Sequence, residues 1–143
     1  MINNKFMQLA LQLAEEAFTL DEIPVGALIV NPKTKLIISS AHNLVEQKKD
    51  PTAHAEILAI KSACKSLQSK NLTGLDLYVT LQPCPMCIQA MIYARIRRVY
   101  FGAYDQDNPL SITSSNHKIE IYGGIYEEKC KSMLQNFFLT KRT

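Results

Sequence analysis

The chain has 143 residues, of which 47% are hydrophobic and 20% are charged, a size and balance that suit one globular domain with a buried core. Its formal charge of +3 permits a nucleic-acid partner but lacks the strongly basic footprint of a dedicated nucleic-acid binder, and no apolar run approaches the roughly 20 residues of a membrane helix. The first residues, Met1 to Phe6, lack the apolar segment of a secretion signal, so we expect a cytoplasmic protein. In that compartment we expect the four cysteines to be reduced thiols or metal ligands.

Hydrophobic periodicity and turn residues predict nine elements along the chain. In chain order these are helix 4–19, strand 25–30, strand 36–39, helix 53–67, strand 75–80, helix 84–94, strand 99–103, strand 119–122 and helix 125–139. Two strand–helix–strand crossovers predict a partly parallel sheet with helices on both faces, and the opening hairpin makes that sheet mixed. No repeat, low-complexity tract or linker interrupts the chain, so residues 1–143 are predicted to form a single α/β domain.

Two short motifs carry the candidate chemistry, His54-Ala55-Glu56 and Pro83-Cys84-Pro85-Met86-Cys87, and each falls at the start of a predicted helix. Cys84 and Cys87 are three residues apart, so their sulfurs lie on one face of their helix. Together with His54 they make three protein ligands, which leaves the fourth tetrahedral position of a zinc ion to water, as in catalytic zinc sites. We therefore predict one Zn²⁺ per subunit, held by His54, Cys84 and Cys87.

Glu56 lies two residues beyond His54, on a different side of the helix, and is predicted to move protons rather than to bind the metal. Zinc can lower the pKa of a bound water to about 7, and a carboxylate there can take the water's proton and pass it to a ring nitrogen and a leaving amine. Taken alone, a Cys-x-x-Cys pair could equally be redox-active or structural. The two motifs in this order form the signature of zinc-dependent nucleobase deaminases.

The other cysteines and histidines have no ligand-like neighbours in the sequence. Cys64 and Cys130 fall on predicted helices and are expected to be buried, inert thiols. We interpret His42 and His117 as ordinary polar residues.

The zinc motifs belong to longer runs: Asp-Pro-Thr-Ala-His-Ala-Glu-Ile at 50–57, Leu-Tyr-Val-Thr-Leu at 77–81 and Pro-Cys-Pro-Met-Cys at 83–87. Weaker matches accompany them at 23–27, 94–96 and 101–103, and at the ending Phe137-Phe138 followed by Lys141-Arg142. With these runs the chain resembles, over nearly its whole length, the bacterial tRNA-specific adenosine deaminases of the cytidine/deoxycytidylate deaminase superfamily. The resemblance implies a three-layer α/β/α cytidine-deaminase-like fold with a five-stranded mixed sheet, a homodimer, and hydrolytic conversion of the wobble adenosine of a tRNA anticodon loop to inosine by a zinc-activated water.

The same resemblance implies which residues contact the substrate. Asn43 matches an asparagine that contacts the base, and Asp105 matches a loop position near the bound nucleotide. Ala55 and Phe138 complete the expected set of substrate contacts, although core packing is the alternative for Phe138 and for its neighbour Phe137. Basic residues expected near the RNA phosphates, which would make binding weaker in salt, are Lys48, Lys49, Arg97, Arg98, Lys141 and Arg142.

Two departures from the family's pattern bear on substrate choice. The family usually has glutamate before Pro-Cys, whereas this chain has Gln82, and the stretch 106–116 is shorter and lacks the usual glycine-rich segment. One alternative is therefore a deaminase of a free base, guanine or cytosine, because the zinc runs also resemble guanine deaminases. An alternative of another class is a non-catalytic, zinc-stabilised RNA-binding subunit, which Glu56 disfavours because such a subunit commonly lacks that glutamate.

Overall fold

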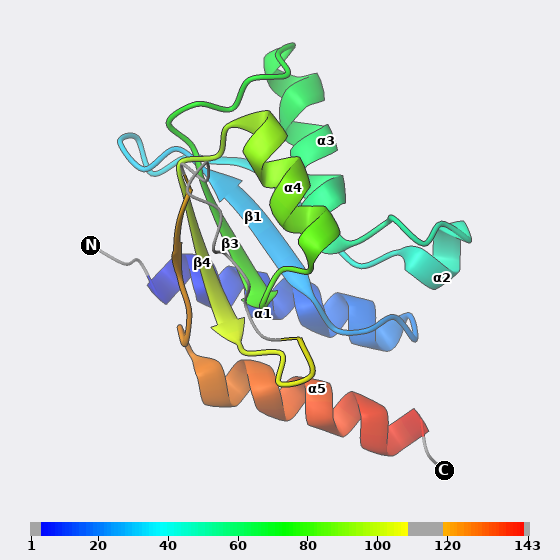
Figure 1. Cartoon of the computed structure of the whole chain (residues 1–143). Helices are drawn as coiled ribbons and strands as arrows, with labels where there is room; N and C mark the ends of the chain where they lie inside the picture. Colours follow the sequence, from blue (N-terminus) through cyan, green and yellow to red (C-terminus); the bar gives the residue numbers. More distant parts are fainter. Residues whose placement is uncertain (1–3, 109–118, 142–143) are drawn as a thin grey trace.

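A mixed five-stranded sheet forms the centre of the protein, of which the computed structural model describes residues 4–108 and 119–141 (Figure 1). The strands are β1 (Gly26–Val30), β2 (Ile37–His42), β3 (Asp76–Leu81), β4 (Arg98–Ala103) and β5 (Glu120–Tyr122), and they lie in the order β2-β1-β3-β4-β5. Strand β1 is antiparallel to both of its neighbours, whereas β3, β4 and β5 run parallel to one another. The prediction of a mixed, partly parallel sheet is thus confirmed.

Helices cover both faces of this sheet and complete the predicted three layers. Their bounds are α1 (Asn4–Thr19), α2 (Val45–Lys48), α3 (Ala55–Leu67), α4 (Pro85–Ala94) and α5 (Glu127–Lys141). Helices α3 and α4 pack on one face, and α1 and α5 pack on the other (Figure 1). None of the described helices combines the length and the apolar character needed to cross a membrane.

Two elements differ from the sequence-based expectation by more than two residues. Strand β2 extends to His42, three residues beyond the predicted end, because it remains paired with β1 as far as Gly26. The short helix α2 was not predicted at all. Four residues are too few to show a helical period, and α2 depends on a hydrogen-bond acceptor from elsewhere in the chain, described below.

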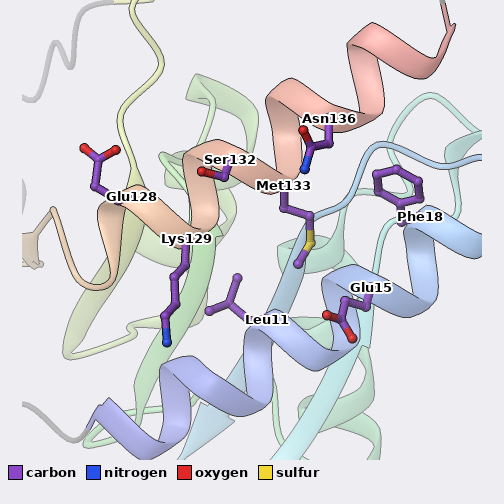
Figure 2. A pocket seen from close by; sticks show the side chains of 8 residues that line it. All are labelled: Leu11, Glu15, Phe18, Glu128, Lys129, Ser132, Met133 and Asn136. Atoms are coloured by element: carbon purple, nitrogen blue, oxygen red, sulfur yellow. The ribbon is translucent and has the colours of Figure 1, made fainter.

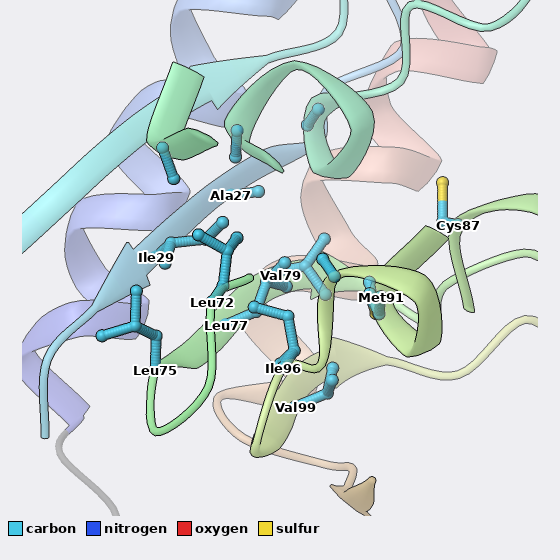
Figure 3. Close-up of a cluster of buried hydrophobic side chains, with 14 of the residues drawn as sticks. Ala27, Ile29, Leu72, Leu75, Leu77, Val79, Cys87, Met91, Ile96 and Val99 are labelled. Atoms are coloured by element: carbon cyan, nitrogen blue, oxygen red, sulfur yellow. The ribbon is translucent and has the colours of Figure 1, made fainter. Parts of the chain in front are cut away.

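The buried side chains divide between the two faces of the sheet. The larger cluster lies between the sheet and helices α3 and α4, and it includes Ile29, Leu77, Val79 and Met91 (Figure 3). All five residues of β1 are buried, which explains its uninterrupted apolar sequence. On the other face, a β-carbon at Gly26 would collide with the carbonyl oxygen of Ala10, so glycine at this position lets α1 pack directly on the sheet.

Candidate metal centre and active site

The candidate metal ligands lie at the amino-terminal ends of α3 and α4. His54 is the N-cap of α3 and Cys84 is the N-cap of α4, and neither side chain caps its own helix. Both therefore remain available for a ligand. Pro85 occupies the first helical position of α4, where its fixed φ is pre-organised for the helix, and Cys87 follows in the first turn. The prediction that both motifs start helices is confirmed.

The three ligand atoms converge at distances that suit tetrahedral zinc. The Nδ1 atom of His54 lies 3.7 Å from Sγ of Cys84 and 3.5 Å from Sγ of Cys87, and all three atoms lie within 4.8 Å of one another. In a tetrahedral site with Zn–S of about 2.3 Å and Zn–N of about 2.1 Å, a sulfur and a nitrogen ligand are about 3.6 Å apart. The donor set and its spacing therefore fit zinc with a fourth position left over.

Hydrogen bonding between the two cysteines makes one of them a good anionic ligand. The thiol of Cys87 donates to Cys84 and lowers the pKa of Cys84 to about 5. The same bond, together with burial, raises the pKa of Cys87. Because Cys84 is also at a helix N-terminus, its thiolate lies where the helix dipole favours negative charge.

Glu56 is the buried carboxyl group of the site. It is only 4% exposed, and this burial raises its pKa to about 7. The Cys87 thiol and the Glu56 side chain form a hydrogen bond, which places the carboxyl group beside the candidate ligands. A carboxyl group whose pKa is near neutral can both accept and release a proton at physiological pH.

A pocket of about 460 Å³ opens onto these residues. Its lining combines His54, Glu56 and Cys84 with Asn43 and Asp105, two of the predicted substrate contacts. The sheet brings these segments together because β3 and β4 are parallel and both end at this edge. A buried pocket with a few convergent polar groups and a perturbed carboxyl group has the properties of an enzyme active site.

Comparisons with known proteins match this chain to deaminases. The family model of MafB19-like deaminases matches residues 1–142. A tRNA-specific adenosine deaminase of Aquifex aeolicus is 46% identical over 143 residues, covering 93% of this chain and 91% of the relative. A structure solved in a study of A-to-I editing by tRNA:A34 deaminases has a TM-score of 0.85 at 38% identity, covering 92% of this chain and 100% of that chain.

The chain belongs to the tRNA-specific adenosine deaminase family. Its α/β/α fold is therefore the one predicted from the resemblance. A guanine deaminase structure from Bacillus subtilis is also similar, with a TM-score of 0.69 at 39% identity, but it covers 75% of this chain and 68% of its own.

Two other predicted substrate contacts, Ala55 and Phe138, are not in the pocket lining. Ala55 is fully buried and its backbone N–H donates to Oδ1 of Asn43 at 2.8 Å, so its amide already has a partner. Phe138 is half-exposed and lies outside the pocket lining, whereas Phe137 lines the pocket and packs edge-on against Phe18 at 5.4 Å. Of the two phenylalanines, Phe137 is the one that contributes both to the core and to the pocket wall.

One site residue has no sequence motif to reveal it. Glu22 is 1% exposed, lines the pocket, and accepts hydrogen bonds from the backbone N–H groups of Glu46 at 3.1 Å and Gln47 at 2.7 Å. It thereby caps α2, whose own N-cap, Leu44, provides no side-chain hydrogen bond. The only sequence signal is a carboxylate immediately before the apolar run that leads into β1.

Among the described residues, the basic side chains expected near phosphates are divided between the two ends of the sheet. Arg97 and Arg98 lie at the start of β4, at the sheet edge opposite the pocket, and pair with Asp76 and Glu120. Lys141 does line the pocket. Of the remaining basic residues, Lys48 and Lys49 are exposed at the end of α2, next to the pocket-lining Glu46, and Arg142 lies outside the described residues.

The remaining candidate residues and cavities are separate from this site. Cys130 is buried as expected, with its pKa raised to about 12 by desolvation, whereas Cys64 is only partly buried, at the edge of the core. The Nε2 atom of His42 lies 3.8 Å from Oε2 of Glu16, and His117 lies outside the described residues.

A groove of about 580 Å³ between α1 and α5 (Figure 2) contains none of the candidate metal ligands.

Proposed function

We propose that this chain hydrolyses the wobble adenosine of a tRNA anticodon loop to inosine, with release of ammonia. The observation that carries the proposal is the convergence of the His54, Cys84 and Cys87 ligand atoms beside the buried carboxyl group of Glu56, at a pocket lined by His54, Cys84 and Glu56. The family membership supports the choice of substrate, since the Aquifex aeolicus relative bears the name tRNA-specific adenosine deaminase.

In this proposal the three ligands hold one zinc ion per subunit, which would act as a Lewis acid that makes a water molecule nucleophilic near neutral pH. Glu56 accepts a proton as water adds to C6 of adenine. It delivers this proton to the neighbouring ring nitrogen, then takes the second proton from the hydroxyl group added at C6 and passes it to the amine, which leaves as ammonia. The pKa of about 7 suits both directions of transfer.

Asn43 is proposed to orient the base. Its side-chain oxygen is engaged by the N–H of Ala55, which leaves the side-chain NH₂ as the donor available to a base edge in the pocket. A target base must leave its stack to reach such a buried site, and unpaired anticodon bases can be splayed out at low cost. We also propose, from the resemblance, that the enzyme acts as a homodimer in the cytoplasm.

A guanine deaminase is the second candidate, because the similarity to the Bacillus subtilis guanine deaminase reaches 39% identity. It would use the same ligands and the same glutamate. The two candidates differ only in what enters the pocket, so a substrate comparison separates them. A non-catalytic subunit would need no proton-transfer group, and the burial of Glu56 beside the ligands argues against it.

The test offers zinc-loaded protein an anticodon stem-loop with a wobble adenosine, the same stem-loop with a wobble guanosine, free guanine and free cytosine. We expect inosine in the first stem-loop alone, with one ammonia released per inosine. Turnover of a free base with the stem-loop untouched would overturn the RNA substrate and leave the deaminase chemistry standing. No turnover of any substrate by protein carrying one zinc would favour the binding subunit.

A further inference from the structure

A single buried amide joins the end of β3 to the turn that follows β4. Gln82 follows β3 directly and is 7% exposed. Its side-chain oxygen accepts a hydrogen bond from the backbone N–H of Asp105 at 3.0 Å. Its side-chain NH₂ donates to the carbonyl oxygen of Asn108 at 2.7 Å. Gln82 therefore holds both ends of the turn 105–108, and the rest of the stretch 106–116, from residue 109 on, lies outside the described residues.

The turn is otherwise organised by its own first residue. The carboxylate of Asp105 accepts hydrogen bonds from the N–H of Asp107 at 3.1 Å and from the side-chain nitrogen of Asn108 at 2.9 Å. These bonds shape the turn but do not attach it to the sheet. The attachment comes from Gln82, and both Gln82 and Asp105 line the pocket.

The donor half of the amide is what distinguishes glutamine from glutamate here. A glutamine side chain offers both a donor and an acceptor, whereas an ionised glutamate offers acceptors only. A carboxylate at position 82 would keep the contact to the N–H of Asp105. Its second oxygen, however, would face the carbonyl oxygen of Asn108 with no hydrogen between them.

We propose that Gln82 is a positioning residue for substrate recognition: its neutral amide fixes the turn 105–108 as a wall of the pocket and so sets the affinity for a nucleotide presented in an RNA loop. The inference rests on the proposed function. The candidate zinc ligands and Glu56 are carried by the ends of α3 and α4, not by this turn. A displaced wall should thus weaken substrate binding and leave the chemistry largely intact.

The kinetic test compares Gln82→Met, which removes both hydrogen bonds, and Gln82→Glu, which removes the donor, with the wild type. The matched control is Gln12→Glu, which adds the same charge at an exposed position of α1, outside the pocket lining. We expect both Gln82 variants to raise KM for the stem-loop about tenfold, with kcat within about twofold and one zinc per chain. The control should stay within about twofold in KM. Unchanged KM in both Gln82 variants, or a joint loss of kcat and zinc, would overturn the proposal.

A second readout needs no turnover. Amide hydrogen exchange at Asp105 in the zinc-loaded proteins should become faster in Gln82→Met, because the acceptor for that N–H is gone, and should change less in Gln82→Glu. Equal exchange in wild type and Gln82→Met would show that Gln82 does not anchor the turn. If the wild type fails to deaminate the stem-loop, the proposed function is wrong, whereas the exchange measurement still decides the anchoring role.

Discussion

The side-chain oxygen of Asn43 accepts a hydrogen bond from the backbone N–H of Ala55 across 2.8 Å. The bond connects the end of β2 to the first turn of α3, between His54 and Glu56. One side chain thus satisfies a helix N-terminus and also faces the pocket. Its two polar atoms have separable tasks, which single substitutions can distinguish.

Asn43→Asp should keep the cap on α3, because aspartate retains the acceptor oxygen, but it loses the NH₂ donor proposed to contact the base. Asn43→Ala loses both. We expect Asn43→Ala to lower the free energy of unfolding by about 1 kcal/mol, and both variants to lose catalytic efficiency. Urea unfolding and stem-loop kinetics check the two effects. An Asn43→Asp protein with wild-type efficiency would contradict the proposed base contact.

Glu56→Gln should lower kcat by about 100- to 10,000-fold, the usual contribution of a general acid–base group. Glutamine has nearly the volume of glutamate but cannot accept and release a proton. Zinc content, measured by mass spectrometry, and the thermal unfolding temperature should show that the site is retained. A kcat within about threefold of wild type would exclude Glu56 as the proton carrier.

Cys84 should be the most reactive thiol in chelator-treated protein. Because its pKa is lowered to about 5, the thiolate predominates above pH 6, so its alkylation rate by iodoacetamide should change little from pH 6.5 to 8. An ordinary thiol gains roughly tenfold in rate per pH unit over this range. Peptide mapping identifies the modified residue, and Cys84→Ala is the control. Zinc added beforehand should protect Cys84, and the lack of protection would argue against its role as a ligand.

Asp21→Asn should strengthen RNA binding. The Nζ atom of Lys141 lies 2.7 Å from Oδ1 of Asp21, and both residues line the pocket. Removing the acidic partner frees the lysine for a phosphate, and asparagine tolerates the left-handed backbone at this position, where φ is 61°.

For Asp21→Asn we expect KM for the stem-loop to fall by about two- to fivefold and stability to change by less than about 1 kcal/mol, because the pair is exposed. Glu128→Gln, in the groove between α1 and α5, makes the same charge change away from the pocket and serves as the control. Equal effects of the two variants would indicate a general charge effect rather than release of Lys141.

Glu22→Ala should destabilise the protein more than a typical surface substitution. The change leaves the N–H groups of Glu46 and Gln47 at the start of α2 without their buried acceptor, at a cost of about 2 kcal/mol. Glu22→Gln keeps one acceptor oxygen and should recover part of the loss. Denaturant unfolding measures the difference, and equal stabilities for the wild type and Glu22→Ala would show that this cap contributes nothing.

The sequence by itself determined the elements with a long local pattern and the identity of the candidate ligands. Helices α3 and α4 begin within two residues of their predicted starts, because helix starts depend on neighbouring residues such as Pro85. The spacing of Cys84 and Cys87 likewise predicted a shared helix face, since three residues are nearly one helical turn.

Only the tertiary structure decided the contacts between distant segments. The placement of β3 between β1 and β4, the capping of α2 by Glu22 and the attachment of the turn 105–108 by Gln82 all join residues more than twenty positions apart. A short helix or a turn has no period of its own for the sequence to show. Its place depends on which distant donor or acceptor reaches it once the sheet has formed, and for this reason the contacts that Glu22 and Gln82 make in the pocket wall could not be predicted.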